Sequence, residues 1–442
     1  MPPAALFNPV QLSRGRSVEW TPRRAIDTRS NSTMPLSTHQ ILACVIAQWH
    51  AAQRLMPGCR TSVDPFLATL PKDFLSVPLT WAIAPDTVAD AEALLANLPP
   101  SAATRAADVR ARFDDDWAHV AELSASTRTQ LWACISETDV APDIALSDFL
   151  WGWLCTNSRC VYMDLQYVRH ADNFTLAPLL DMANHAACPR RECRVRFSSR
   201  DGLELYAPAQ PLQRGEEVYI TYGAHSNSLL LAEYGFVLPR VVDTGEPGVW
   251  HGNRFCDVLL DTAVERLLDA QGKVGAWKRR ILIEEGYSGC VQWRANASDY
   301  TLHPVPAPAH PSHRLHTALR LVCLTVALGD ATPSHPASKA NSTAMTAEPL
   351  KRPRTARVYT SEDALRVWRL VTRGGRECIS AENENDVRVT LMELCSAVQA
   401  DHAVRRKSVP PGALGDILRQ LLDEESEILA MVHAGASRGE EW

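Results

Sequence analysis

The sequence lacks any Cys-x-x-Cys pair, although twelve cysteines are spread over its 442 residues. Structural zinc clusters ordinarily use closely spaced ligand pairs, so we predict no metal site. Cys188 and Cys193 in CPRREC, five positions apart, are the one alternative, as shared metal ligands. Because no secretory leader is recognisable, the thiols are expected to stay free in a reducing compartment, the cytoplasm and/or the nucleus.

Long apolar runs are also missing. The longest, at 41–52 and 319–328, fall short of the roughly 18–20 residues that a membrane-spanning helix needs. The amino terminus, MPPAALFNPVQLSRGR, has no continuous apolar core and therefore does not resemble a signal peptide. The net charge of −6 gives no global basic field. We therefore predict a monomer that contacts neither membrane nor nucleic acid, and KRPR at 351–354 is only a weak nuclear-import signal.

What is present is an ordinary globular composition, with 46% hydrophobic and 22% charged residues. The length allows two or three domains. The first ~35 residues have no periodicity and are predicted to form a loose arm. Apolar spacing predicts a buried helix at 41–56, a turn at 63–71 and helices from 86 to about 154, broken by Pro99-Pro100. A further apolar helix, SDFLWGWLCTNSR, should end near Arg159.

The pattern changes after Arg159. Alternating residues around Gly202 predict a hairpin, and EEVYITYG at 216–223 predicts a half-buried strand. SNSLLLAEYGF predicts a short helix capped by Ser226 or Asn227. Helical patterns return at 254–290, 312–329, 360–405 and 411–434, whereas 330–357 is predicted to be disordered.

Three strings within 80 residues carry the candidate chemistry: NSR at 157–159, LLDMANH at 179–185, and EEVYITYG with SNSLLLAEYGF at 216–236. Each has an ordinary interpretation when taken alone. Asn184-His185 fits a turn with local hydrogen bonds, Tyr222 and Tyr234 fit half-buried aromatics, and Arg159 fits a surface ion pair. The arginines at 190, 191, 194, 196 and 200 fit a solvated hairpin face. The order and spacing of all three strings favour a functional site.

Together the strings resemble the SET-domain methyltransferases, and within them the subgroup of Rubisco large-subunit methyltransferase. That subgroup has a Ser-Arg pair at a strand end, then P-L-x-D-M-x-N-H, a basic hairpin, G-E-E-V-x-I-x-Y-G and S-N-x-x-L-L-x-x-Y-G-F. The resemblance covers about 150–240 and continues more weakly through IEEGYSG and DYTLHP at 283–304. It implies an α+β chain with a β-rich SET domain at 1–242, a helical insertion at about 65–154, and an all-helical, substrate-binding domain at 245–442.

The resemblance also implies S-adenosylmethionine as the cofactor and a lysine of another protein as the acceptor. In-line methyl transfer needs a bound donor and a desolvated, aligned amine, but no metal. Asn184 and His185 would receive the amino-acid and adenine parts of the cofactor, and Arg159 would pair with its carboxylate through a planar fork. Tyr222, the predicted catalytic residue, would direct its hydroxyl at the methyl group and the amine.

The remaining implied site residues form the substrate channel: Ser158, Asp181, Tyr234 and Phe236, of which Phe236 also contacts the cofactor. An aromatic channel lowers the pKa of an entering lysine by desolvation and so raises its reactive neutral fraction.

The family's amino-terminal Gly-x-Gly turn is not recognisable here. Its only counterpart is SRGRSVEWTPRRAI at 13–26, with one glycine, and the helix at 41–56 begins too soon for the strands that should follow. We therefore predict an incomplete amino-terminal part, decayed or cut from a longer gene, and weakened cofactor binding. Two other functions stay open: a non-catalytic SET scaffold with a degraded cofactor site, and a protein histidine methyltransferase.

Overall fold

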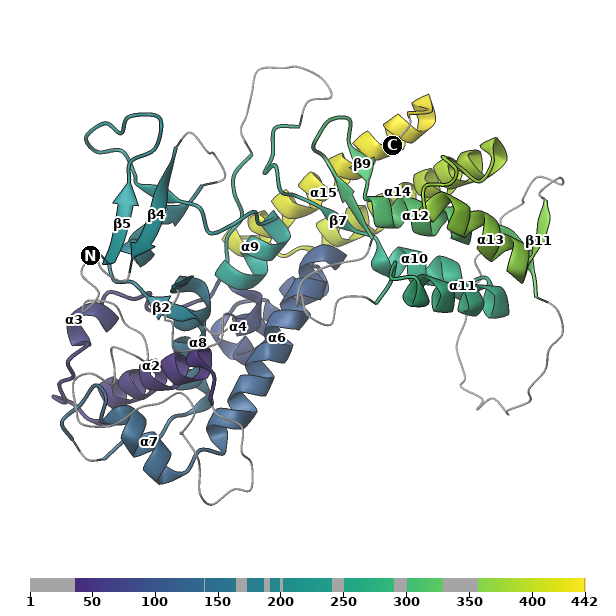
Figure 1. Cartoon of the computed structure of the whole chain (residues 1–442). Coiled ribbons are helices and arrows are strands. Elements are labelled where there is room, and N and C mark those ends of the chain that lie inside the picture. Colours follow the sequence, from purple (N-terminus) through teal and green to yellow (C-terminus); the bar gives the residue numbers. More distant parts are fainter. Residues whose placement is uncertain are drawn as a thin grey trace. The chain divides into compact units, whose positions relative to one another are not determined.

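The computed structural model describes residues 36–138, 140–163, 173–186, 191–198, 202–240, 250–289, 300–328, 357–440 and 442. Its packing divides the chain into two units (Figure 1). The first unit holds the described residues of Met1–Gly245 with His251–Cys256 and Arg405–Leu422, and the second holds the rest. The predicted arm, the glycine turn at 13–26, Cys188, Arg190, Arg200 and the linker up to residue 356 lie outside the described residues.

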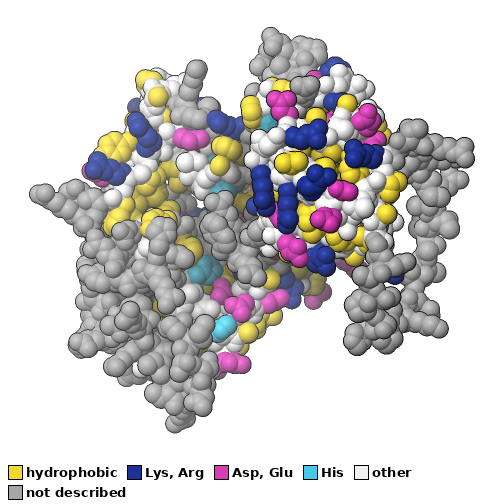
Figure 2. Space-filling model, turned by 45° about the vertical axis from the view of Figure 1, so that its right-hand side comes forward, with side chains coloured by type: hydrophobic (Ala, Val, Ile, Leu, Met, Phe, Trp, Pro, Cys, Tyr) yellow, Lys and Arg dark blue, Asp and Glu magenta, His cyan; other side chains and the backbone are white. Residues whose placement is uncertain are grey.

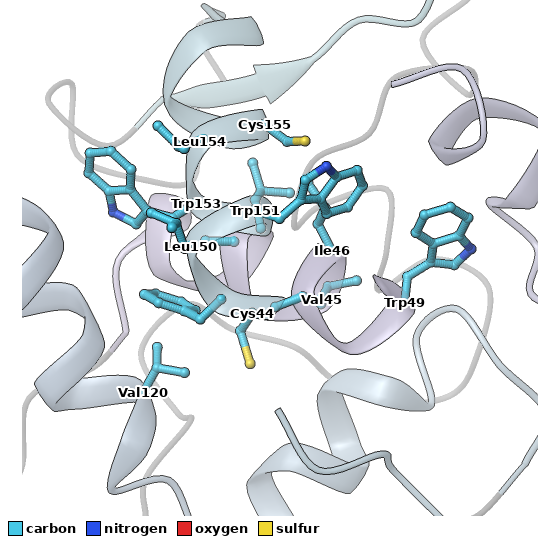
Figure 3. Close-up of a cluster of buried hydrophobic side chains, with 14 of the residues drawn as sticks. Cys44, Val45, Ile46, Trp49, Val120, Leu150, Trp151, Trp153, Leu154 and Cys155 are labelled. Carbon is cyan, nitrogen blue, oxygen red and sulfur yellow. The ribbon is translucent and has the colours of Figure 1, made fainter. Parts of the chain in front are cut away.

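Two apolar helices form the centre of the first unit. Helix α2 (Thr38–Leu55) confirms the predicted buried helix and begins with a capping box between Ser37 and Gln40. Helix α8 (Leu146–Arg159) packs along it, and their shared cluster includes Val45, Ile46, Trp151 and Trp153 (Figure 3). Because α8 ends at Arg159, this core holds the first of the three motif strings in place.

Close packing of α2 and α8 depends on Gly152. A Cβ atom at this position would lie 2.6 Å from the carbonyl oxygen of Ala43 and 2.7 Å from the backbone nitrogen of Ala47. Real Cβ atoms do not approach backbone atoms so closely, so only glycine allows the two helices to meet at this distance. The residue thereby fixes the separation of the helices behind the candidate site.

The predicted helical insertion contains short helices and one long one. The structure gives α3 (Asp64–Leu67), where a turn was predicted, then α4 (Pro78–Ile83), η2 (Pro85–Thr87), α5 (Ala91–Ala96), α6 (Pro100–Ala121) and α7 (Ala125–Trp132). Pro99 and Pro100 separate α5 from α6 as predicted, because a proline is tolerated in the first turn of a helix but not in its interior.

The strands of the first unit are short. β1 (Cys160–Tyr162) pairs with β2 (Phe174–Leu176). A four-stranded sheet has the order β3 (Asn184–His185), β6 (Tyr219–Ile220), β4 (Glu192–Ser198), β5 (Gly202–Tyr206). The predicted hairpin is β4–β5, and the exposed side chains of Arg194 and Arg196 lie on it. The turn η4 (Leu180–Met182) precedes β3, and α9 (Asn227–Tyr234) follows β6.

Two details differ from the sequence prediction. The strand expected over 216–223 extends only over Tyr219–Ile220, because Glu216 accepts a turn hydrogen bond from the Gln213 N–H and Gly223 turns the chain with φ +138°. The resemblance implied a strand end at Ser158-Arg159, but the pair forms the last turn of helix α8, which ends at Arg159 as the apolar pattern predicted, directly before β1.

The second unit is mainly helical, as predicted, and contains α10 (Asp261–Asp269), α11 (Gly272–Glu284), α12 (His313–Val322), α13 (Ser361–Thr372) and most of α14 (Ala381–Ser408). Helices α13 and α14 therefore replace the single helix predicted for 360–405, since Gly374 at φ +74° ends the helical path between them. The unit also has two small sheets that were not predicted, β7–β8–β9 (Val258–Leu259, Thr301–His303, His310–Pro311) and β10–β11 (Thr325–Ala327, Val358–Thr360).

The last helix, α15 (Ala413–Arg438), contributes to both units. Leu418, Leu421 and Leu422 pack within the first unit against Trp81 and Leu231. The predicted division of the chain at 242–245 stays a prediction, and residues 405–422 belong structurally with the first unit.

No helix in the described residues combines the length and the apolar content that crossing a lipid bilayer requires. On the face shown in Figure 2, basic, acidic and apolar side chains are intermixed.

Candidate functional site

The Asn184-His185 string forms the edge strand of the four-stranded sheet. β3 runs parallel to β6, so Asn184 pairs with Tyr219 and His185 with Ile220. Alternation along a strand turns the two side chains to opposite faces. Asn184 is exposed, whereas His185 is buried, with only 5% of its surface accessible. One string therefore provides an accessible amide and a buried imidazole.

A direct hydrogen bond joins this string to the tyrosine that follows β6. The backbone N–H of Tyr222 donates to His185 Nδ1 over 3.1 Å, and the two rings stack with centroids 5.1 Å apart. Burial lowers the pKa of His185, which favours the neutral imidazole. Since Nδ1 accepts, the proton of the neutral ring is on Nε2.

Tyr222 lies in a group of aromatic rings with Tyr234 and Phe236. Its ring centroid is 5.1 Å from that of Tyr234 and 6.4 Å from that of Phe236. Its hydroxyl donates to the carbonyl oxygen of Ala183 over 2.9 Å, which fixes the phenol and leaves its oxygen free to accept. Burial raises the pKa of both tyrosines, so both phenols keep their protons at neutral pH.

Gly223 allows the chain to turn sharply after Tyr222. A Cβ atom there would lie 2.5 Å from Nε2 of His225, and φ is +138°. The imidazole of His225 donates from Nε2 to the Tyr222 carbonyl oxygen over 2.9 Å. Burial lowers the pKa of His225 as well. Sequence reasoning missed His225, although its place inside the third string was a usable signal.

Arg159 and Asp181 meet as an ion pair. Arg159 Nη1 donates to the Asp181 carbonyl oxygen over 2.9 Å and approaches its carboxylate Oδ2 at 3.3 Å. The Asp181 side chain is fully buried, and burial raises its pKa although the guanidinium opposes the shift. The turn that brings Asp181 to the arginine passes through Leu179, whose φ of +76° is unusual for a residue with a branched side chain.

Ser158 does not join this group through its hydroxyl, which donates to the Leu154 carbonyl oxygen one helical turn earlier, 2.7 Å away. Its neighbour Asn157 instead belongs to a polar network. Arg112 from α6 bonds to Asn157 and to Glu233 of α9 at 3.1 and 2.5 Å, and Asn157 donates to Glu233 over 2.8 Å. The predicted insertion thus supports the helix that carries Tyr234, a role that no sequence pattern indicated.

Several polar atoms at the site have no partner among the described residues. Arg159 uses Nη1 for Asp181, while its buried Nε has no hydrogen bond, and the same holds for the buried Nε2 of His185. Asn184 donates from Nδ2, and its oxygen accepts no hydrogen bond from the described residues. Unused donors and an amide oxygen match the groups of a ligand that carries both a carboxylate and an ammonium group. Within the described ranges, no cluster of side chains has the composition of a metal site.

Comparison with known proteins gives several relatives but no matching family model. Ribosomal lysine N-methyltransferase set11 of Schizosaccharomyces pombe is 36% identical over 139 residues, which are 31% of this chain and 30% of the relative. SET domain-containing protein 4 of Mus musculus is 28% identical over 274 residues, 60% of this chain and 52% of the relative. Ribosomal lysine N-methyltransferase 2 of Saccharomyces cerevisiae is 26% identical over 274 residues, 58% and 51% of the two chains. The chain thus spans about half the length of two of these relatives and less of the third.

Proposed function

We propose that this chain, which belongs to the SET-domain family of protein methyltransferases, transfers methyl groups from S-adenosylmethionine to lysine side chains of another protein. The observation that supports the proposal most strongly is the bond between the Tyr222 N–H and His185 Nδ1. It joins two separate motif strings. The ring of Tyr222 in turn packs with the rings of Tyr234 and Phe236. The similarity to the Rubisco methyltransferase subgroup stays a prediction.

The residues present fit the cofactor. Asn184, with an amide oxygen able to accept from an ammonium group, and Arg159, with unused guanidinium donors, would hold its amino-acid part. The rings of His185 and Phe236 would line the remainder of the cofactor site. When bound, S-adenosylmethionine supplies a methyl group already activated on a positively charged sulfur. The fixed phenol oxygen of Tyr222 would orient that methyl group through weak C–H···O contacts.

The lysine would approach between aromatic rings. Tyr222, Tyr234 and Phe236 have centroids between 5.1 and 6.4 Å apart, so the rings pack against one another and would offer the lysine an apolar aromatic surface. Such surroundings disfavour the ammonium form, lower the pKa of the entering lysine and exclude competing water. Asp181, predicted to line the channel, is held by Arg159 and would act by fixing that arginine. Ser158 would contribute its backbone position, since its hydroxyl is bonded within α8.

The protein acceptor is proposed to dock on the second unit, whose helices carry no cofactor-binding string. Two of the relatives are named ribosomal lysine N-methyltransferases, so a lysine of a ribosomal protein is the first acceptor to test. The monomeric state, the cytoplasmic or nuclear location and the absence of nucleic-acid binding stay predictions.

Two alternatives are separated by simple measurements. A non-catalytic scaffold has no need of the cofactor, so calorimetric titration with S-adenosylmethionine distinguishes it from an enzyme. A histidine methyltransferase would bind the cofactor equally well but would leave the methyl group on an imidazole. Saturable binding that is lost on replacing Asn184 by alanine supports the proposed enzyme site, whereas absence of binding supports the scaffold.

A further inference from the structure

The Asn184 side chain is held by a carboxylate that the motif comparison did not assign. Nδ2 of Asn184 donates to Glu217 Oε1 over 2.5 Å, and the Tyr219 hydroxyl donates to Glu217 Oε2 over 2.8 Å. These contacts span the pairing between β3 and β6, where Asn184 lies opposite Tyr219. Both carboxylate oxygens therefore have neutral donors. These two hydrogen bonds lower the pKa of Glu217, which is ionised at neutral pH.

The hydrogen bond determines which way the amide of Asn184 points. An ionised carboxylate has no donor, so Asn184 must turn its NH₂ group toward Glu217. Its oxygen then faces away from the carboxylate, as an acceptor for an external donor. Without Glu217, no carboxylate would fix the amide, and the orientation that presents a donor where an ammonium group needs an acceptor would also be accessible.

Glu217 also brings negative charge to this edge of the sheet. Among the described residues it has hydrogen-bond donors but no ion-pair partner, and the guanidinium of Arg191 lies over the neighbouring Tyr219 ring, 5.8 Å from its centroid. S-adenosylmethionine carries one net positive charge, from its ammonium, sulfonium and carboxylate groups. After transfer, the product has lost the sulfonium charge and is neutral overall. A fixed negative charge therefore acts differently on donor and product.

We propose that Glu217 is a positioning and selectivity residue, which orients the Asn184 amide and makes the site favour the cationic methyl donor over the neutral product. The inference depends on the proposed function, because it assumes that Asn184 binds the cofactor. It assigns to Glu217 two separable effects. Orientation of the amide strengthens binding of both ligands, since both have the ammonium group. The charge strengthens binding of S-adenosylmethionine alone, and salt should weaken this effect because the carboxylate is exposed.

Two substitutions separate these effects. Glu217→Gln keeps an oxygen that can accept from Asn184 but removes the charge, whereas Glu217→Ala removes both. Glu216→Gln is the matched control, with the same change in charge at the preceding residue, whose carboxylate accepts from the Gln213 N–H and from no other described residue. Each variant of the full chain is titrated with S-adenosylmethionine and with S-adenosylhomocysteine by calorimetry, at low and at high salt, after its melting temperature has been compared with wild type.

Glu217→Gln should weaken S-adenosylmethionine binding by about three- to tenfold and S-adenosylhomocysteine binding by less than about twofold, with the difference shrinking at high salt. Glu217→Ala should weaken both ligands, and Glu216→Gln neither. Equal weakening of both ligands by Glu217→Gln would overturn the charge preference, and unchanged binding in Glu217→Ala would overturn the positioning role. If the wild-type chain binds neither ligand, the proposed function itself fails.

Discussion

The backbone N–H of Tyr222 donates a 3.1 Å hydrogen bond to Nδ1 of His185, and the two rings stack in parallel fashion, with 24° between their planes. This contact joins the end of β6 to the edge strand β3. It requires a neutral imidazole with an unprotonated Nδ1, which burial of the ring favours. Protonation of this histidine would therefore remove one of the contacts between the two motif strings, which the β3–β6 pairing also joins.

Replacing Tyr222 by phenylalanine should slow methyl transfer without changing the fold of the site. The substitution keeps the stacked ring and removes only the hydroxyl that bonds to Ala183. We expect at least about a tenfold fall in kcat, or ~1.4 kcal/mol of barrier, with little change in cofactor affinity. Kinetics with S-adenosylmethionine, together with calorimetry, measure both quantities. Unchanged turnover would remove Tyr222 from the catalytic residues.

The buried histidines should make the protein less stable in mild acid. Burial lowers the pKa of His185 and His225 below the model-peptide value of 6.5, so the unfolded chain binds protons more readily than the folded one. Their stabilising contribution is complete above about pH 6.5 and is lost as pH falls through the folded pKa values. The melting temperature should therefore decrease between about pH 7 and pH 5. His185→Phe should flatten that dependence; an unchanged pH profile in the variant would contradict this account.

Gly152→Ala tests the close approach of α2 and α8. Here alanine should destabilise a helix that it would ordinarily stabilise. In a helix, alanine is usually more stabilising than glycine by about 1 kcal/mol. Here the added methyl group would meet the backbone of α2 at 2.6–2.7 Å, so we expect a loss of about 1–3 kcal/mol in the free energy of unfolding. Urea denaturation measures it, and a stabilised variant would show that the two helices are not held by this approach.

The sequence was informative where local spacing determines structure. The apolar runs predicted α2 and α8, and the alternation around Gly202 predicted the β4–β5 hairpin, because each depends on residues close in the chain. The order of the motif strings also indicated Asn184, His185 and Tyr222, which the structure brings together.

Contacts between distant segments could not be predicted in this way. Nothing near Arg112 shows that it meets Glu233, because that ion pair depends on how α6 packs beside α9. Glu217 resembles any exposed acidic residue until β3 and β6 pair and place Asn184 beside it. The two small sheets of the second unit likewise consist of strands of two or three residues, too short to give a periodic signal.

Docking of the protein acceptor on the second unit leads to a prediction about its cavity of about 1090 Å³. Asp386 and Glu393 of α14 line it with the apolar Leu324 and Ile379. Glu382 also lines it, so three carboxylates outnumber the two guanidinium groups there, those of Arg357 and Arg376, and the excess negative charge would attract a lysine-bearing segment. Asp386→Asn with Glu393→Gln should weaken acceptor binding by about tenfold or less and leave S-adenosylhomocysteine affinity unchanged.

The control for this experiment is Glu362→Gln with Glu377→Gln, which makes the same change in charge at exposed positions outside the cavity lining. Point substitutions are preferable to deleting the chain from Tyr359 onward, because the deletion would remove Leu418 and Leu421 from the core of the first unit. Equal acceptor affinity in both double variants would show that the acceptor docks elsewhere.

The most direct test of lysine methylation identifies the amino acid that receives the methyl group. The full chain is incubated with S-adenosylmethionine carrying an isotopically labelled methyl group and with a ribosomal protein fraction, which is then hydrolysed to amino acids and analysed by mass spectrometry. The same incubation is run in parallel with the Tyr222→Phe variant. The account predicts labelled methyl-lysine, formed at least about tenfold more slowly by the variant. Label found only in methyl-histidine, or no labelled lysine above the level given by the variant, would contradict it.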